Sequence, residues 1–521
     1  MNRRGLSPEE GPLTREEDHA MATIVLDPVT RIEGHLRVET RWDGPRLAEA
    51  RVAGEMFRGF EAILRGRDAL DAPVITQRIC GVCPVSHAVA SCRALEQALG
   101  IRVPPNGRLL RSLVLGANFL QSHLLHFYHL SILDFVDVAA VLEADSSNSA
   151  VRALQAWVEA EVRSNRVLPA APFLPQWPAG LPPEARWAGR ALGHYLKALE
   201  VRQAAHRMAA RFGGRVPHTA TLVPGGATAG VDPLAVEGFR SELASVRGFV
   251  EEVYLPDALE LAARFPRLAD QGVGPDQYLT FGAFEEADGR LWLPAGVWTG
   301  DRLDPLDPGR ITEETAHSRY RGADRARPLA GETEPAPEKP GAYSWLKAPR
   351  YEGRPVEVGP LARLRVAAAS GLPEVKEAGE RWLAPAGLRL SDLSGVTGRH
   401  LARALEAWML IRRMETWLDR LDLAGPTVGP YEPTASGEGA GLVEAPRGAL
   451  GHWVRVRDLR IETYQCIVPS TWNFSPRDGR GRPGPVEAAL EGLEPPQGEP
   501  RGLAVARVVR SFDPCIACAV H

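Results

Sequence analysis

Four of the six cysteines of this chain form two Cys-x-x-Cys pairs at opposite ends of the sequence. The pairs are Cys80/Cys83 and Cys515/Cys518, and 435 positions separate the first cysteine of one from the first cysteine of the other. If both pairs bind one metal, the beginning and the end of the chain must meet in the core. The spacing therefore favours one integrated domain over a string of independently folded units.

The two pairs are compatible with several kinds of site. Four thiolates suffice for a structural zinc ion or for a catalytic metal, because soft metals prefer sulfur ligands. Two separate redox-active pairs, and buried thiols without a ligand role, are the remaining interpretations. His87 lies four positions after Cys83, on a helix that Pro84 can open, and His521 lies three positions after Cys518. These histidines favour a metal site, with His87 as a hydrogen-bond donor to a thiolate.

The composition is that of an ordinary globular protein. Of the 521 residues, 44% are hydrophobic and 24% are charged, which excludes a wholly disordered chain. The 61 basic and 65 acidic residues give a formal net charge of −4, so we expect no nucleic-acid partner. Six cysteines are too few for a secreted scaffold built on disulfides.

No targeting or membrane-spanning segment is expected. Residues 1–20 are polar and predict a disordered tail, and Met21 is an alternative start of translation. Arg3 and Arg4 are not followed by an apolar stretch, so we expect no signal peptide in this chain. The uncharged run 112–133 carries three histidines and two amides, which predicts a buried helix and not a lipid-exposed one.

The hydrophobic periodicity predicts long helices separated by short β-rich segments. We therefore expect an α+β fold that is mainly α, with a single large domain over 21–521. A central bundle of long helices is expected, flanked by small β-rich segments, with the N- and C-terminal CxxC motifs meeting in the core. The clearest helix, 398–421, places its leucines and Trp408 near one face. Expected helices are 107–145, 149–165, 185–212, 232–265 and 398–421, expected strand-like segments are 22–60, 275–365 and the chain beyond 425, and 168–185 is an expected Pro-rich connector.

Both cysteine motifs resemble those of a known family. RICGVCPVSHAVAS (78–91) and DPCIACAVH (513–521) are similar to the two nickel-binding signatures of the NiFe-hydrogenase large subunit. The similarity covers 21–521 and looks closest to the respiratory uptake type. Further similar segments are RIEGHLRVE (31–39), MFRGFEAILRGRD (56–68), HFYHL (126–130), YSWLKAPRYEGRPVEVGPLAR (343–363), EAPRGALGHW (444–453) and YQCIVPSTWN (464–473).

The resemblance implies a catalytic subunit that reversibly splits H2 into protons and electrons, in the uptake direction. Cys80, Cys83, Cys515 and Cys518 are expected to bind nickel, and Cys83 and Cys518 also to bridge to an iron that carries CO and cyanide. Cys515 is the expected first proton acceptor. Glu33 is the expected carboxylate that relays the proton away from that thiolate.

Further residues take their expected roles from the same resemblance. Arg447 is expected to overhang the open metal position, with Asp513 holding its orientation. Pro446 and Ser470 are expected to line the pocket of the cyanide ligands. A magnesium ion is expected at Glu61, the backbone carbonyl of Cys466 and His521, because hard cations prefer oxygen ligands.

Two features depart from the family pattern. Ser122 stands where many relatives have an acidic residue, so we expect the hydrogen bonds around Arg447 to differ. The family precursors usually continue past the residue that corresponds to His521. This sequence is therefore expected to be the processed form, or a protein made without the extension, as in some H2-sensing relatives. Cys92 and the side chain of Cys466 receive no role.

Electron transfer implies partners, since this chain has no cysteines left for an Fe–S cluster of its own. The family implies a heterodimer with an Fe–S small subunit, a membrane cytochrome b as acceptor, and maturation proteins. Co-export with a partner that carries a Tat signal would place the complex on the periplasmic side of the membrane; a cytoplasmic location is the alternative. Two other functions remain open, an H2-sensing regulatory subunit and, more remotely, a structural zinc protein.

Overall fold

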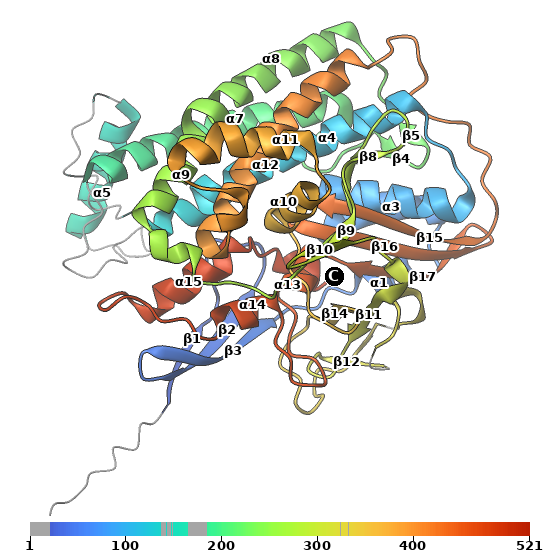
Figure 1. The fold of residues 1–521 in the computed structure, drawn as a ribbon. Helices are drawn as coiled ribbons and strands as arrows, with labels where there is room; N and C mark the ends of the chain where they lie inside the picture. Colours follow the sequence, from blue (N-terminus) through green and yellow to red (C-terminus); the bar gives the residue numbers. More distant parts are fainter. Residues whose placement is uncertain are drawn as a thin grey trace, which may run out of the picture.

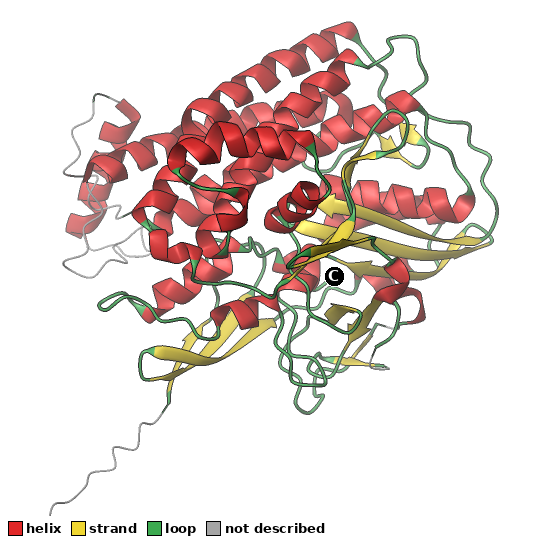
Figure 2. Cartoon of the chain, in the orientation of Figure 1, coloured by secondary structure: helices red, strands yellow, loops and turns green. Residues whose placement is uncertain are grey.

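The computed structural model describes most of the chain. The described residues are 21–136, 149–164, 185–322, 325–331 and 333–521, together with Leu142 and Ser147. The tail predicted over 1–20 and nearly all of the connector predicted over 168–185 lie outside these residues. Helices gather on one side of the molecule and small sheets on the other, which confirms a mixed helix-and-strand fold (Figure 2).

Four long helices pack against one another (Figure 1). Helix α4 (Pro105–Leu124) contacts both α7 (Ala185–Gly213) and α12 (Gly395–Asp419), and α7 also contacts α8 (Pro233–Phe249). The periodicity of α12 predicts one apolar face, but the helix is buried on all sides as far as Ile411. Because neighbours cover it all round, its polar residues need partners inside the protein.

Helix α4 is shorter than the sequence predicts. It ends at Leu124, and a π-helical turn (Leu125–Ser131) and a 3-10 turn (Ile132–Asp134) follow it. The ring of His126, inside the π turn, bonds through Nε2 to the carbonyl of Arg510 at 2.7 Å. This contact comes from a residue far along the chain, so the periodicity of the segment could not reveal where the α-helix ends.

Three three-stranded antiparallel sheets are present in the described part of the chain, and one of them, within residues 277–304, has the strand order β10-β9-β6. Of the other two, the first comprises β1 (Ala22–Leu26), β2 (Leu36–Asp43) and β3 (Arg46–Gly54). The second comprises β15 (Gly437–Ala445), β16 (Gly448–Arg457) and β17 (Arg460–Ile467). Both sheets follow chain order, as short antiparallel connections permit.

A stripe of glycines brings β15 close to α3 (Pro84–Leu99). A Cβ at Gly437, Gly439 or Gly441 would lie 2.1 Å or less from a carbonyl oxygen of α3. Alternate residues of a strand share one face, so all three glycines meet the same helix. The helix that follows the first cysteine pair is thereby held directly on the sheet.

The remaining elements are short or connect these layers. The expected helices 149–165 and 232–265 are present as α5 and as α8 followed by a π-helical turn and α9. The bounds are α1 Phe60–Leu64, α2 Ala72–Thr76, α5 Ser149–Ser164, β4 Leu222–Val223, β5 Gly226–Ala227, α9 Leu255–Arg264, β6 Gln277–Thr280, β7 Ala283–Glu285, β8 Leu291–Leu293, β9 Gly296–Thr299, β10 Arg302–Asp304, β11 Ile311–Glu314, β12 Tyr320–Arg321, β13 Glu334–Pro335, β14 Ala348–Tyr351, α10 Pro360–Ala369, α11 Pro373–Ala378, α13 Pro469–Asn473, α14 Pro485–Leu490, α15 Arg501–Ser511 and α16 Ile516–Ala519.

The beginning and the end of the chain meet in the core, as the cysteine spacing predicts. One apolar cluster extends from Val29 to Val520 and includes all four cysteines of the two motifs. The last residue, His521, is only 6% exposed, and Figure 1 marks the C-terminus among the surrounding elements. Among the helices of the described part of the chain, none combines the length and the apolar character that a membrane span requires.

Candidate metal centre

The four motif cysteines form one buried group. The sulfur atoms of Cys80 and Cys515 lie 3.4 Å apart, as do those of Cys83 and Cys518, and 2.7 Å separates Cys515 from Cys518. All four sulfurs lie within 4.8 Å of one another, and none is in a disulfide. Four convergent buried thiols fit a soft metal, because thiolate charge in an apolar core needs a cation beside it.

A helix begins at the second cysteine of the first motif and at the first cysteine of the second motif. Cys83 is the N-terminal cap of α3, where Pro84 occupies the first helical position, and Cys515 is the cap of α16. The backbone N–H groups of Val82 and Cys83 donate to the sulfur of Cys80, at 3.2 and 3.4 Å. The motif thus folds its own backbone donors around its first cysteine.

The thiols differ in acidity. Hydrogen bonds from the neighbouring thiols, Cys515 first, hold the pKa of Cys80 well below its usual value. Burial raises the pKa values of Cys515 and Cys518 well above theirs. A bound cation would therefore be needed to hold all four sulfurs as thiolates together.

Backbone and side-chain bonds join the two ends of the chain at this group. The N–H of Glu33 donates to the carbonyl of Pro514 at 3.3 Å, and the N–H of Ile516 donates to the carbonyl of Glu33 at 2.7 Å. Arg58 donates to the carbonyls of both motif regions, at 3.0 Å to Arg78 and 3.2 Å to Ala517. Arg58 was not predicted from the sequence as a site residue, because only the fold brings these carbonyls together.

The side chain of Glu33 is half-buried beside the cysteines. Burial raises its pKa above the usual value, the negative charge of Cys80 adds to this, and Arg447 opposes it. A raised pKa makes this carboxyl group easier to protonate than a freely exposed one.

Arg447 lies buried over the same group. Its Nε donates to the backbone carbonyl of Asp513 at 3.0 Å, and its Nη2 lies 2.9 Å from Asp513 Oδ1 as an ion pair that is not aligned as a hydrogen bond. Burial lowers the pKa of Arg447, but the charges of Asp513 and of the cysteines outweigh it and raise that pKa above its usual value. The guanidinium is thus a fixed positive charge.

Ser122 contacts the guanidinium of Arg447. The hydroxyl of Ser122 accepts a hydrogen bond from Arg447 Nη1 at 3.3 Å. The acceptor that Arg447 meets here is neutral. Among the described residues, Asp513 is the only carboxylate that forms an ion pair with Arg447.

His87 makes its direct contact with another histidine. Its Nδ1 lies 3.1 Å from Nε2 of His452, whose Nδ1 lies 2.8 Å from the hydroxyl of Tyr464. Tyr464 in turn donates to Ser91 at 2.9 Å. Burial lowers the pKa of His87 to about 4, so its ring is neutral. His452 was not predicted from the sequence, since only the packing of α3 on β16 places it here.

Ser470 contacts the backbone of Cys515, and Pro446 precedes Arg447 in the chain. The Ser470 hydroxyl, at the start of α13, accepts a hydrogen bond from the backbone N–H of Cys515 at 2.8 Å. The carbonyl of Pro446 accepts from Arg363 at 2.9 Å, which fixes the turn between β15 and β16 just before Arg447. Both residues therefore hold the backbone of residues at the site.

A second group lies beside the C-terminus, at Glu61, Cys466 and His521. Glu61 Oε1 accepts from the backbone N–H of Cys466 at 2.8 Å and lies 3.2 Å from His521 Nε2. Lys347 Nζ lies 3.5 Å from Glu61 Oε2. Burial alone would raise the pKa of Glu61, but Lys347 and His521 lower it to about 2. The carboxylate is thus ionised and surrounded by cationic and donor groups.

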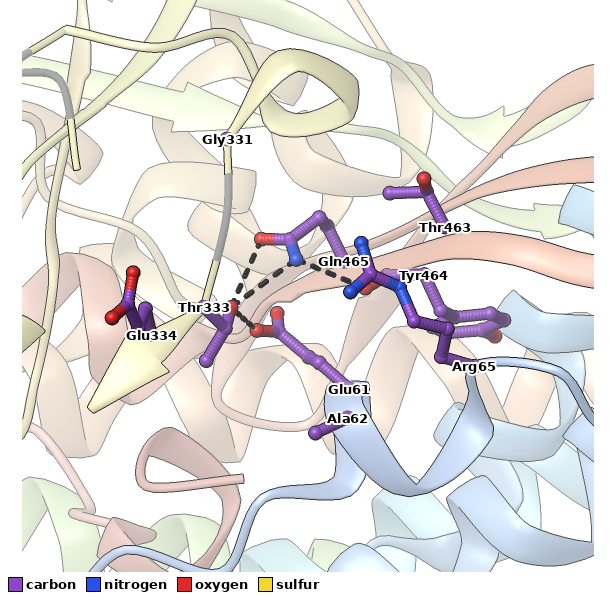
Figure 3. A pocket seen from close by; sticks show the side chains of 9 residues that line it. All are labelled: Glu61, Ala62, Arg65, Gly331, Thr333, Glu334, Thr463, Tyr464 and Gln465. Carbon is purple, nitrogen blue, oxygen red and sulfur yellow. Dashed lines mark hydrogen bonds between the residues drawn. The ribbon is translucent and has the colours of Figure 1, made fainter. Parts of the chain in front are cut away.

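A cavity of about 310 Å³ opens onto this second group (Figure 3). Thr333 donates to Glu61 from one wall, and Gln465 bonds to Thr333 through its amide nitrogen at 3.2 Å. Arg65 lies on the opposite side in the same view. The cavity gives Glu61 a polar approach from outside, whereas none of the four motif cysteines lines it.

Comparison with known proteins shows to which family the chain belongs. Residues 58–521 match the family model described as nickel-dependent hydrogenase, and residues 23–51 match one described as HoxL-like. The chain belongs to the nickel-dependent hydrogenase family. It is a catalytic large subunit of a nickel-dependent hydrogenase, an oxidoreductase that acts on H2.

Relatives of two hydrogenase types resemble the chain along nearly its whole length. It is 39% identical to the periplasmic NiFeSe hydrogenase large subunit of Desulfomicrobium baculatum, over 96% of this chain and 94% of that one. It is 35% identical to the uptake hydrogenase large subunit of Bradyrhizobium diazoefficiens, over 97% and 96%. The solved NiFeSe hydrogenase of D. vulgaris Hildenborough superposes with a TM-score of 0.83 at 38% identity, covering 96% of this chain and 100% of that one. The hydrogenase fold predicted from the two motifs is confirmed.

Proposed function

We propose that this hydrogenase subunit holds a nickel–iron pair at its cysteine group and works in the direction of H2 uptake. The four buried sulfurs support nickel at Cys80, Cys83, Cys515 and Cys518, with Cys83 and Cys518 bridging to iron. The close approach of both motifs is the observation that carries the proposal. When bound, the pair supplies the redox chemistry that splits H2 and takes up its electrons.

The chain's own residues move the proton. Cys515 accepts it at Sγ, and the carboxyl group of Glu33 carries it away. Three features support this route: Glu33 is bonded through its backbone on both sides of Cys515, it is half-buried, and its raised pKa suits a group that is repeatedly protonated.

Arg447 and Asp513 act as a fixed charged pair above the metal position. A guanidinium cannot deprotonate here and needs no reorganisation when charge develops beside it. Ser470 and Pro446 line the pocket of the CO and cyanide ligands of the iron. Ser470 is buried, and its hydroxyl, already bonded to the N–H of Cys515, can turn its own proton toward a cyanide nitrogen.

The second group is proposed to bind magnesium through Glu61, the carbonyl of Cys466 and His521. The ionised carboxylate of Glu61 supports a hard cation. The Cys466 sulfur lies within 4.8 Å of the other two ligand atoms, but burial raises its pKa well above the usual value, so the thiol stays protonated. The carbonyl therefore remains the proposed ligand of this residue.

An Fe–S small subunit is the proposed electron acceptor, since the two remaining cysteines, Cys92 and Cys466, are buried away from the surface. Exposed apolar side chains lie on the segment that leads into Cys80 or on elements that contact it, and they favour this face as the docking surface. They are Ile63, Leu70, Val74 and Leu459.

The small subunit is also proposed to connect the enzyme to a membrane cytochrome b on the periplasmic side, after maturation proteins have inserted the metals.

A substitution on the proposed docking surface tests it: Val74→Asp should weaken co-purification with the small subunit. Leu234→Asp, at an exposed apolar position of α8, should leave it intact.

Infrared spectroscopy of the complex purified from its host tests the metal assignment. Metal-bound CO and cyanide bands, with nickel and iron in elemental analysis, are expected. Zinc without these bands, even after addition of the maturation machinery, would contradict the proposal. Cys515→Ala should abolish H2-dependent dye reduction, whereas Cys92→Ala, a buried thiol outside the group, should retain it.

A further inference from the structure

The carbonyl of Val82, between the two cysteines of the first motif, accepts two side-chain amides. Asn118 Nδ2 donates to it at 3.1 Å and Gln121 Nε2 at 3.0 Å. These residues are three positions apart on α4 and therefore lie on one face of that helix. Two buried amides thus converge on the peptide that joins Val82 to Cys83.

The orientation of Gln121 is set by its partners on α7. Its Oε1 accepts from Arg202 Nε at 3.2 Å and lies 3.2 Å from His206 Nε2. Because a guanidinium only donates hydrogen bonds, the amide oxygen must face Arg202, and the NH2 group must face Val82. None of the described carboxylates forms an ion pair with Arg202, so its charge acts on Gln121 without local compensation.

The other end of the same peptide bonds to a thiolate. The N–H of Cys83 donates to Cys80 Sγ at 3.4 Å, alongside the N–H of Val82 at 3.2 Å. A peptide whose carbonyl accepts hydrogen bonds becomes a stronger N–H donor, because the chain of bonds polarises it. The positive charge of Arg202 on α7 polarises Gln121 and, through it, the peptide between Val82 and Cys83. The N–H of that peptide therefore donates more strongly to the sulfur of Cys80.

We propose that Asn118, Gln121 and Arg202 are positioning residues that raise the reduction potential of the metal bound by Cys80. Stronger N–H donation to a ligating thiolate withdraws electron density from the sulfur and stabilises the reduced metal. The proposal rests on the proposed function, in which Cys80 is a nickel ligand. It assigns α7, a helix that contributes no metal ligand, to the tuning of the centre.

Three substitutions in the purified heterodimer test this network. Arg202→Met keeps the aliphatic stem and removes the charge, and Gln121→Met and Asn118→Leu remove the amides at similar volume. The control is Arg207→Met on the same helix, where an exposed arginine pairs with Glu242 at 2.9 Å. The readouts are the nickel midpoint potential, from a redox titration followed by EPR, and the infrared CO stretch.

The expected result is a more negative potential and a lower CO frequency in each of the three variants, with no change in Arg207→Met. For Gln121→Met we expect a change of about tenfold in the redox equilibrium, which is about 59 mV for one electron. If Gln121→Met or Asn118→Leu loses its metal, the inference is tested by the potential of Arg202→Met alone. An unchanged potential in Arg202→Met, with CO and cyanide bands present, overturns the inference and leaves the proposed function intact. Absence of those bands from the wild type would instead refute the proposed function.

Discussion

Gly34 offers a direct test of how the loop between β1 and β2 holds the C-terminal motif. Its φ is +85°, and an added Cβ would lie 2.4 Å from the backbone nitrogen of Ala517 and 3.0 Å from the carbonyl carbon of Ile516. Gly44 provides a matched control, since its φ is +54° and nothing lies within 4 Å of an added Cβ. Both positions disfavour a side chain through backbone conformation, but only Gly34 also meets a steric clash.

The two costs can be estimated separately. A left-handed conformation costs an alanine roughly 1–2 kcal/mol, which applies to Gly34→Ala and Gly44→Ala alike. Forcing backbone away from a closely packed Cβ costs about 1–3 kcal/mol more, which applies to Gly34→Ala alone. Relieving the clash would stretch the hydrogen bond from the N–H of Ile516 to the carbonyl of Glu33, which is 2.7 Å long.

Urea denaturation of both variants and nickel content per chain measure the effect. Gly34→Ala should unfold at a lower urea concentration than Gly44→Ala and should bind less nickel, because its C-terminal motif is displaced from the first. Gly44→Ala should keep the nickel content of the wild type. Equal denaturation midpoints and equal nickel content in the two variants would refute the reasoning, since the steric contact would then have no consequence.

Three further predictions follow from the site and its surroundings. Glu33→Gln should strongly reduce H2 turnover while part of the H/D exchange survives; equal survival of both activities would remove Glu33 from the proton route. Arg447→Lys cannot keep the forked contacts with Asp513 and should lower kcat by about 10²–10³-fold at unchanged nickel content, and full turnover would argue against a role for the guanidinium. Burial, and then Arg202, lowers the pKa of His129 from 6.5 to about 4, so the unfolded chain binds a proton that the folded chain does not as the pH falls from 6.5 to 4. Stability should therefore drop over this range by up to about 3 kcal/mol on account of this residue. His129→Gln should flatten that part of the pH dependence in urea denaturation, and an unaltered slope would show that the ring is not the cause.

Much of the site was accessible from the sequence because its chemistry is concentrated in short motifs. The two cysteine pairs, with His87 and His521 at fixed offsets, are enough by themselves to indicate a metal site. The same motifs carry the resemblance that the family match confirms. The long helices were accessible for a similar reason, since helical periodicity repeats within a few turns of the chain.

Contacts between distant residues could not be predicted in this way. Arg58 ties both motifs together only because Ala517 is folded against it, across 459 positions of sequence. From the sequence, Asn118 and Gln121 are predicted only to lie in a buried helix. Nothing in their spacing indicates that their amides bond to the carbonyl of Val82. The glycines of β15 likewise show their purpose only when α3 lies against them.

By itself the sequence determined which side chains are candidate metal ligands, because soft metals prefer sulfur and four cysteines stand in two short motifs. It also determined where most of the long helices run. The tertiary structure decided which charges and donors surround those ligands, including Ser122 beside Arg447 and Arg202 behind Gln121. The physical reason is that the hydrogen bonds acting on a metal ligand come from whichever element packs there, and that packing depends on the whole core.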